Sequence, residues 1–559
     1  MKKMRKEKAL LLVILFVGLT YWSCSDSNSG TQETRVKTTV DQTLVPDDPD
    51  TTFIPQVSDV DSFAKYGYGI YHIGAGEPSV VRTDLMPSGY DYASVTKETK
   101  LLSFFTITDI HITDEESPAQ AIVFSTFERL GEVRISLYSP LMPYTTQVLD
   151  ATIKTINKYH KDSPLDFGLV LGDMANSAQY NELRWFIDIM DGKRINPDSG
   201  ADDDPIAGEN NDFQDVFQAE GLDSSIPWYA AIGNHDHFWL GSKLVSDNIR
   251  QAMIGTNILQ MPFILYDDGY IYSTGVLDSS KPNAPIIGAG RTDILTDIPT
   301  VAADGNRRSL TTYGVINEFS NTTSRPVGHG FVQENSANVW GGCYSFIPES
   351  DIPVKVIVLD NTMKDNDPPY QEGIYGHASL DNGRYEWLMA QLQAGQDANQ
   401  LMIIAAHIPI GVVSENNAMS WIPVTPGYTS QADLIEQLKA FPNLILFVAG
   451  HRHLNTVKEF VSSDASHPEN SFWQVETKSL REFPEQFRTF EISRNSDNTI
   501  SITATVVDPE MPEGSLAAKG REYAIASNQL YNINPAQTGY NVVLLKQLSA
   551  AMQAIISKY

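Results

Sequence analysis

The sequence predicts an α/β protein, and two observations carry that prediction. Short apolar runs alternate along the chain with segments whose apolar residues recur at helical spacing. Near the C-terminal end, three apolar runs follow one another without a helical segment between them. Strands that alternate with helices build an α/β core, and consecutive strands build antiparallel pairs, so we expect one α/β core and a second, mixed sheet.

The strands and helices are expected in alternation. The core strands are short and apolar, and they are predicted at residues 101–108, 166–171, 227–232, 354–359, 401–406 and 443–448. The helices are predicted at 144–160, 181–190, 383–393 and 431–441. In the first helix, Val148, Leu149, Ile153 and Ile156 share one face. The late strands are predicted at 472–477, 488–493 and 499–507.

Residues 1–23 are typical of a lipoprotein-type signal peptide. Basic residues precede an apolar segment, Ala9 to Leu19, that is too short to span a bilayer, and Cys24 follows it. An ordinary secretory signal or an uncleaved anchor is the alternative. The polar residues 24–60 predict a flexible tether. We therefore expect an exported protein, anchored to a membrane by lipid on Cys24, in the periplasm or on the cell surface.

Composition and charge narrow the class of partner. The chain has 559 residues, 42% of them hydrophobic, which allows a large core without disulfides. Besides Cys24 the sequence has one cysteine, Cys343, which we expect to be buried. The formal net charge is −29, and removing residues 1–23 takes away five positive charges and one negative charge and leaves −33. Such a surface repels phosphate backbones, so non-specific nucleic-acid binding is not expected.

Polar residues follow five of the predicted strands directly. They are, in chain order, Asp109 and His111; Gly172 and Asp173; Gly233, Asn234, His235 and Asp236; His407; and Gly450, His451, Arg452 and His453. Each motif alone is weak, because a histidine after a strand is more often structural. Five of the eleven histidines of the chain fall at these points, however. Since ligands bind beyond the carboxyl ends of strands in α/β sheets, the set predicts a metal site.

The types of residue also indicate the metals. Carboxylates, imidazoles and an amide without thiolates suit Mn, Fe or Zn. About seven ligands are too many for one tetrahedral ion and suit two divalent or trivalent ions that share a carboxylate.

The motif order D-x-H, G-D, G-N-H-D, H, G-H-x-H resembles that of the calcineurin-like metallophosphoesterase superfamily, over about residues 100 to 455. Segments near residue 80 and after residue 513 are also similar to a bacterial, lipoprotein-type branch of it. The resemblance implies a four-layer α/β/β/α sandwich of two mixed sheets with long loop insertions. It also implies hydrolysis of a phosphoester by a hydroxide that bridges two metal ions.

The resemblance assigns a role to each motif. Asp109, His111 and His453 would bind the first metal, Asp173 would bridge, and Asn234, His407 and His451 would bind the second. His235 would stabilise the transition state or act as general acid, with Asp236 supporting it or serving the turn.

One position departs from the family. In the protein-phosphatase branch an aspartate three residues after the bridging one pairs with the catalytic histidine, and the purple acid phosphatase branch has a tyrosine there. This chain has Asn176, which cannot stabilise an imidazolium as a carboxylate does. Asn176, His237, His329 and Arg452 are the candidate substrate contacts.

The sequence organises the rest as a catalytic domain at 61–508 and a C-terminal extension at 509–559 packed on it. An insertion at about 250–350 is expected to shape the substrate entrance. The acidic segment 191–225 is expected to be a solvated loop, with a calcium site as the alternative.

Two questions stay open in the sequence. Phosphodiesters are slightly favoured over phosphomonoesters, because a large insertion suits a second ester group. The alternative function is a non-catalytic surface binding protein on a phosphoesterase scaffold, which predicts lost ligands, and none is missing. If the strand before Gly450 stays extended, His451 and His453 point the same way and Arg452 the other way.

Overall fold

The computed structural model describes residues 35–131, 133–263, 268–331, 341–348, 351–368, 373–412, 421–531 and 540–559. The predicted signal peptide and Cys24 lie outside these residues. The chain divides into Met1–Arg35 and Val36–Tyr559, and the described helices and strands all belong to the second unit. Within the described part, no helix combines the length and apolar character that a membrane span requires.

The first large sheet has seven strands in the order β3-β20-β19-β18-β4-β5-β8. β4, β5 and β8 run parallel, whereas β18 and β19 pair antiparallel with their neighbours. Its strands are β3 (Val80–Arg82), β4 (Lys97–Ile107), β5 (Phe167–Val170), β8 (Trp228–Ala230), β18 (Phe487–Asn495), β19 (Ile500–Val507) and β20 (Val542–Lys546).

The second large sheet has six strands in the order β12-β13-β14-β15-β17-β16. β13, β14, β15 and β17 run parallel, and the two edge strands are antiparallel to their neighbours. Its strands are β12 (Tyr344–Phe346), β13 (Val354–Leu359), β14 (Leu401–Ala406), β15 (Leu444–Ala449), β16 (Thr456–Phe460) and β17 (Phe472–Glu476).

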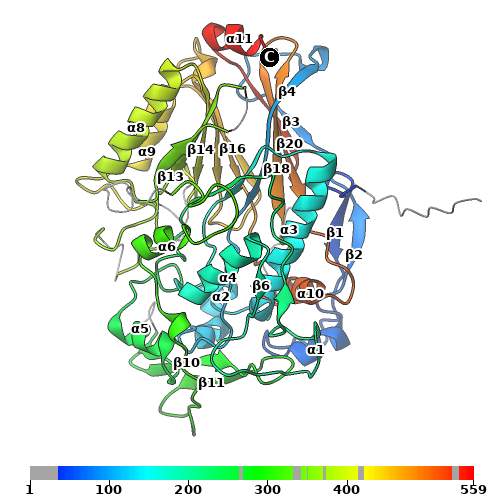
Figure 1. Cartoon of the computed structure of the whole chain (residues 1–559), viewed down its shortest axis with the longest axis vertical. Coiled ribbons are helices and arrows are strands. Elements are labelled where there is room, and N and C mark those ends of the chain that lie inside the picture. The colour runs from blue at the N-terminus through cyan, green and yellow to red at the C-terminus, as the bar shows by residue number, and fades with distance from the viewer. Residues whose placement is uncertain are drawn as a thin grey trace, which may run out of the picture. The chain divides into compact units, whose positions relative to one another are not determined.

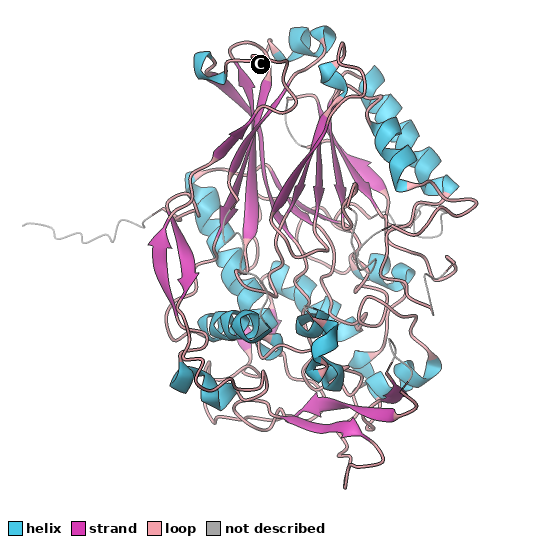
Figure 2. Cartoon of the chain, turned by 180° about the vertical axis from the view of Figure 1, so that it is seen from behind, coloured by secondary structure: helices cyan, strands magenta, loops and turns pink. Residues whose placement is uncertain are grey.

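The two sheets pack face to face between two layers of helices (Figures 1 and 2). Phe104 of one sheet and Val356 of the other belong to one buried cluster, which Ile153 of α3 also joins. Leu388 and Leu434 belong to a second cluster, beside the six-stranded sheet. The covering helices are α3 (Thr145–Asp162), α4 (Tyr180–Met190), α8 (Asn382–Asp397) and α9 (Gln431–Leu438). The four-layer α/β/β/α sandwich is therefore confirmed.

Two terminal segments contribute more than the sequence predicts. Residues 509–559 supply α10 (Leu516–Tyr531), β20 and α11 (Ala550–Ile556), and β20 lies between β3 and β19 inside the sheet. Within the predicted tether, β1 (Gln42–Pro46) pairs with β2 (Tyr71–Ala75), and Val36 is buried in the main core. Residues 36–60 therefore belong to the folded part of the chain, because a few of their apolar side chains find partners that are distant in sequence.

The insertion predicted at 250–350 builds a small sheet of its own. β9 (Gln260–Pro262), β10 (Ile271–Leu277) and β11 (Ile286–Arg291) form it in the order β11-β10-β9. The remaining short elements are α1 (Val60–Tyr66), α2 (Val133–Leu137), α5 (Asp247–Ile254), α6 (Thr312–Glu318), β6 (Arg194–Ile195) and β7 (Phe217–Gln218). Cys343 is buried, as the sequence predicts.

A buried ion cluster ties this insertion to the segment after His111. Arg307 donates to Asp114 (Nε–Oδ2, 3.1 Å) and to Glu116 (Nη2–Oε2, 2.9 Å), and its side chain is fully buried. Ser199, from the acidic segment, donates to Asp114 at 2.8 Å. The segment 191–225 is therefore anchored at this point, rather than a wholly solvated loop.

Replacing Arg307 with methionine is expected to destabilise the protein by roughly 3–5 kcal/mol, because two carboxylates stay buried without their cation. Arg291→Met is the control, since Arg291 pairs with Asp293 in a more exposed position and its loss should cost at most about 1 kcal/mol. Urea denaturation of both variants measures the difference. Equal losses would contradict a stabilising role for the buried cluster.

Candidate metal centre

The carboxyl ends of β4, β5 and β8 in one sheet and of β14 and β15 in the other point to a common region. Polar residues follow each of these ends. Asp109 and His111 follow β4, Asp173 follows β5, Asn234 follows β8, His407 follows β14, and His451 and His453 follow β15. All seven predicted metal ligands are brought together by these ends.

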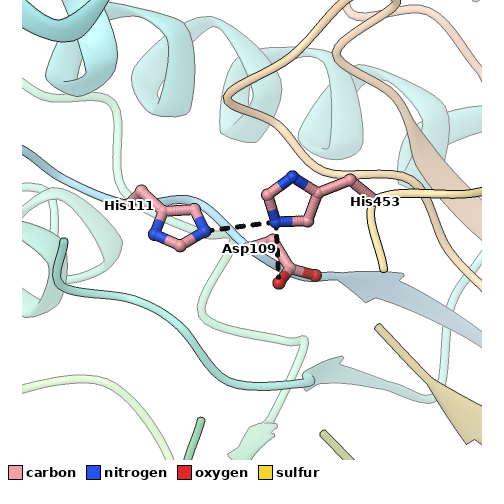
Figure 3. A group of neighbouring side chains, drawn as sticks. All are labelled: Asp109, His111 and His453. Carbon is pink, nitrogen blue, oxygen red and sulfur yellow. Dashed lines mark hydrogen bonds and ion pairs between the residues drawn. The ribbon is translucent and has the colours of Figure 1, made fainter. Parts of the chain in front are cut away.

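Three groups of side chains have ligand atoms within 4.8 Å of one another. The first is Asp109, His111 and His453, whose side chains point toward one another in Figure 3. Asp173 takes part in both of the other groups, which are His111, Asp173 and His235, and Asp173, His407 and His451. The Asp173 carboxylate therefore lies between the two sets of imidazoles, where a bridging ligand would lie.

In the first group, ring nitrogens and a carboxylate oxygen face one another at short distances. His453 Nε2 lies 3.3 Å from Asp109 Oδ1 and 3.3 Å from His111 Nε2. Asp109 Oδ1 is buried and accepts no hydrogen bond from the described residues. Two ring nitrogens and a carboxylate oxygen this close need a proton or a cation between them.

The second group has the same character. His407 Nε2 lies 3.2 Å from Asp173 Oδ2, 2.9 Å from Asn234 Oδ1 and 3.2 Å from His451 Nδ1. His407 Nδ1 interacts with the carbonyl oxygen of Leu171 at 2.7 Å, which leaves Nε2 to face the centre. The Asn234 amide nitrogen donates to the Gly241 carbonyl at 2.9 Å, so the amide oxygen faces His407.

Five of the ligands adopt left-handed backbone conformations. The φ angles are 51° for Asp109, 49° for His111, 53° for Asp173, 71° for His451 and 54° for His453. This conformation costs non-glycine residues conformational energy, and strained residues of this kind are concentrated at functional sites. The condition of an extended chain past Gly450 is not met, because β15 ends at Ala449 and both histidines are left-handed. His451 and His453 nevertheless both reach the centre, and Arg452 pairs with Glu476 instead.

Gly450 permits a close approach between the chain after β15 and the chain after β4. A Cβ on Gly450 would lie 2.0 Å from Thr108 Oγ1 and 2.5 Å from Asp109 Oδ2. The His451 N–H also donates to Asp109 Oδ2 at 2.9 Å. A larger residue at 450 would push the β4 and β15 loops apart and separate ligands of the same ion.

Asp236 acts as a scaffold for two of the loops. Its carboxylate accepts N–H donors from Gly233 (2.8 Å), Asp173 (3.0 Å), Met174 (2.8 Å) and Ala175 (3.1 Å). With four backbone donors on two oxygens, this carboxylate cannot also support His235. Of the two roles predicted for Asp236, the structural one in the turn fits, and the catalytic one does not.

His235 is held with one ring nitrogen inward. Its ring Nδ1 lies 2.6 Å from the carbonyl oxygen of Asn176. The backbone N–H of His235 donates to Asp173 Oδ1 at 2.8 Å. The ring stands edge-on to that of His111, with centroids 4.4 Å apart. Because Nδ1 is engaged, Nε2 is the nitrogen available for chemistry.

Asn176 lies behind His235 and cannot touch substrate. It is fully buried, and its side-chain oxygen accepts a hydrogen bond from Arg481 Nη1. The predicted substrate contact at Asn176 is therefore wrong. Instead, the backbone carbonyl of Asn176 orients His235, the role that an aspartate side chain has at this position in the protein-phosphatase branch.

The three other candidate substrate contacts are also occupied elsewhere. His237 interacts through its two ring nitrogens with Thr312 and Thr362, at 3.2 and 3.1 Å. His329 stacks on Trp228 with centroids 3.4 Å apart and is fully buried. Arg452 pairs with Glu476 of β17 at 2.7 Å. These assignments are corrected to structural roles, because each side chain makes its polar contacts or its ring contact away from the centre.

Burial and neighbouring charge set the protonation of the ligands. Burial lowers the pKa of His111 and of His451 well below the usual value, so their rings are neutral. Burial also lowers the pKa of the other two histidines, but carboxylates outweigh it. Asp173 raises the pKa of His407 to about 9, and Glu482 with Asp109 raises that of His453 to about 10. A metal ion would have to displace those protons, so metal binding is expected to weaken as the pH falls.

The donor set fits metal ions. It consists of carboxylates, imidazoles and one amide oxygen, which suit Mn, Fe or Zn. His453 also shows the outer contact typical of a metal ligand, because its Nδ1 lies 2.7 Å from Glu482 Oε1. Asp109, His111 and His453 would hold one ion, Asn234, His407 and His451 a second, and Asp173 both.

Sequence reasoning missed Arg481 and Glu482. Both follow β17, a parallel strand of the six-stranded sheet, and both are buried. The histidines were predicted because they directly follow apolar strands. Arg481 and Glu482 come five and six residues after the end of β17, so their position in the sequence does not associate them with the strand end.

Comparison with solved structures finds 25 similar chains, and two of them are described here. A dimetal phosphatase from Danio rerio has 9% identity over 74% of this chain and 100% of its own, with a TM-score of 0.37. GAP50, the anchor in the inner membrane complex of Plasmodium, has 10% identity over 77% of this chain and 96% of its own, with a TM-score of 0.28. No family model and no curated protein matches the sequence. The chemistry of the centre is accordingly derived from its own residues.

Gly241→Ala is expected to lower metal affinity by roughly 10- to 100-fold. A Cβ at this position would lie 2.4 Å from the Asn234 amide nitrogen and 2.1 Å from His235 Cδ2, so both residues must move. Calorimetric titration with Mn²⁺ measures the affinity. Gly89→Ala is the control, because Gly89 has a similar φ of +83° but no atom within 4 Å of a new Cβ. Equal Mn²⁺ affinity in the two variants would show that Gly241 does not position Asn234.

Proposed function

We propose that this protein is a metal-dependent phosphoester hydrolase of the calcineurin-like type, with two metal ions. The observation that carries the proposal is the shared position of Asp173 between two groups of buried imidazoles. Two ions held by one carboxylate can clamp a phosphoryl group between them. The centre also opens on a cavity that Asp173, Asn234, His235, His451 and His453 line, so a substrate can reach it.

The residues of the chain divide the work. When bound, the metal ions polarise the phosphoryl group and lower the pKa of water. The ligands fix the position of the phosphorus, and Asp236 and Glu482 hold the ligands in place. Burial lowers the pKa of His235, so its ring is neutral with Nε2 as an acceptor. We assign proton transfer to that atom: it would take up a proton from solvent and donate it to the leaving oxygen as general acid.

Asp173→Asn tests the proposal directly. The amide removes the negative charge that would serve both ions, so we expect fewer than two metal ions per chain and a loss of at least about 100-fold in kcat/KM. Elemental analysis and nitrophenolate release measure the two effects. Asp247→Asn is the control, because the Asp247 side chain is almost wholly exposed. A wild-type protein that binds less than one transition-metal ion, or an active Asp173→Asn enzyme, would contradict the proposal.

The same assay separates diesters from monoesters. We favour phosphodiesters, because the cavity beside the centre has room for a second ester group. Bis(4-nitrophenyl) phosphate should therefore turn over faster than 4-nitrophenyl phosphate. A much faster monoester would reverse the preference.

We also propose that the protein is exported and anchored by lipid on Cys24, on the sequence evidence of the basic and apolar residues before it. Intact-mass measurement of the membrane fraction should show cleavage before Cys24 and an added diacylglyceryl mass. Cys24→Ser should abolish both, and Cys343→Ser, at the other cysteine, should change neither. An unmodified wild-type mass would refute the anchor.

A further inference from the structure

The cavity at the metal centre has walls of two kinds. One end is formed by the ligands and His235, and most of the remaining lining is apolar. The space within the cavity and the solvent at its open mouth together amount to about 1090 Å³. The apolar lining includes Phe124, Leu130, Leu137, Trp239, Leu240 and Phe263.

Separate parts of the chain contribute to the apolar wall. Phe124 and Leu137 come from the segment after the first ligand pair, Trp239 follows the His235 motif, and Phe263 belongs to the insertion. Phe124 and Phe263 are in contact with their rings tilted by 37° and their centroids 4.8 Å apart, and they share one buried cluster with Trp239. The wall is therefore a packed surface, assembled where the insertion meets the catalytic loops.

The Trp239 ring offers the cavity no hydrogen-bond donor. The Trp239 Nε1–H donates to the Ala119 carbonyl at 2.8 Å, so its ring presents carbon to the cavity. Among the described lining residues outside the centre, Lys243 is the sole Lys or Arg, and Ser136 and Ser242 are the hydroxyl side chains. A nucleotide or phosphopeptide needs several donors and charges along its length, and this lining does not supply them.

We infer that the cavity binds an apolar ester group of the substrate, an alkyl or aryl group joined to phosphate, while the phosphoryl group lies at the metal centre. The inference rests on the proposed function and gives it a substrate class. Burial of apolar surface is the driving force, and each methylene removed from water adds about 0.8 kcal/mol, which is about fourfold in affinity. A small polar ester would leave the apolar wall in contact with water, so the wall would not increase its binding affinity.

Binding of phosphonates to the manganese-loaded protein tests this without turnover. Methyl-, butyl- and hexylphosphonate carry the same charged head and differ in apolar length. Calorimetry should give about fourfold tighter binding per added methylene, until the chain fills the cavity. Phenylphosphonate forms a second arm: tighter binding than hexylphosphonate assigns an aryl group, and weaker binding assigns an alkyl chain. Equal affinities for methyl- and hexylphosphonate would overturn the inference.

Two variants locate the effect. Leu137→Gln and Leu130→Gln place an amide in the wall at partly exposed positions, and each should reduce the hexyl-to-methyl affinity ratio at least threefold. Leu530→Gln is the matched control, since Leu530 is partly buried in a different cluster. An unchanged ratio in both wall variants would place the alkyl group elsewhere and refute the assignment.

Failure of this inference differs from failure of the proposed function. Hydrolysis of nitrophenyl esters together with phosphonate binding that ignores chain length overturns the apolar specificity and leaves the hydrolase intact. Chain-length-dependent binding without hydrolysis of any ester overturns the hydrolase and supports the apolar cavity.

Discussion

The rest of this structure depends on burying negative carboxylates among imidazoles. Asp109 and Asp173 are almost completely excluded from solvent, and Asp109 Oδ1 accepts no hydrogen bond from the described chain. In the absence of a metal, protonated His407 and His453 balance the negative charge of the nearby carboxylates, which raise their pKa values to about 9 and about 10. A cation is the more complete solution, because it satisfies every inward-facing nitrogen and oxygen at once.

The strain at the ligands is sustained by contacts that lie outside the metal shell. Five left-handed ligand residues would relax if their loops were free. The Asp236 carboxylate gathers the N–H groups of two loops, and Glu182 accepts N–H donors from Asp114 and Ser177, three and four residues beyond two of the ligands. Backbone donors fixed in this way leave the loops one conformation, which preorganises the centre.

Local patterns were sufficient to predict the strands, the covering helices and the residues brought to the centre, because each of these follows from periodicity and from where a buried strand ends. Side-chain direction was not predictable in this way. His451 and His453 reach the centre through left-handed turns, and Arg452 turns to Glu476, a residue on another strand. β20 likewise enters the sheet through pairing with β19, which ends 35 residues earlier at Val507, and with β3, at the other end of the chain. Such non-local contacts leave no periodic trace.

Chemistry and selectivity are built from different parts of the chain. The strand ends supply the ligands, which the geometry of two parallel sheets holds fixed, whereas the insertion supplies Phe263 to the cavity and Arg307 to the buried ions at Asp114. Because Arg307 fastens the insertion to the loop that carries His111, the apolar wall and the metal ligands share one rigid support. A change of insertion could then alter the ester group that is accepted while the ligands stay in place.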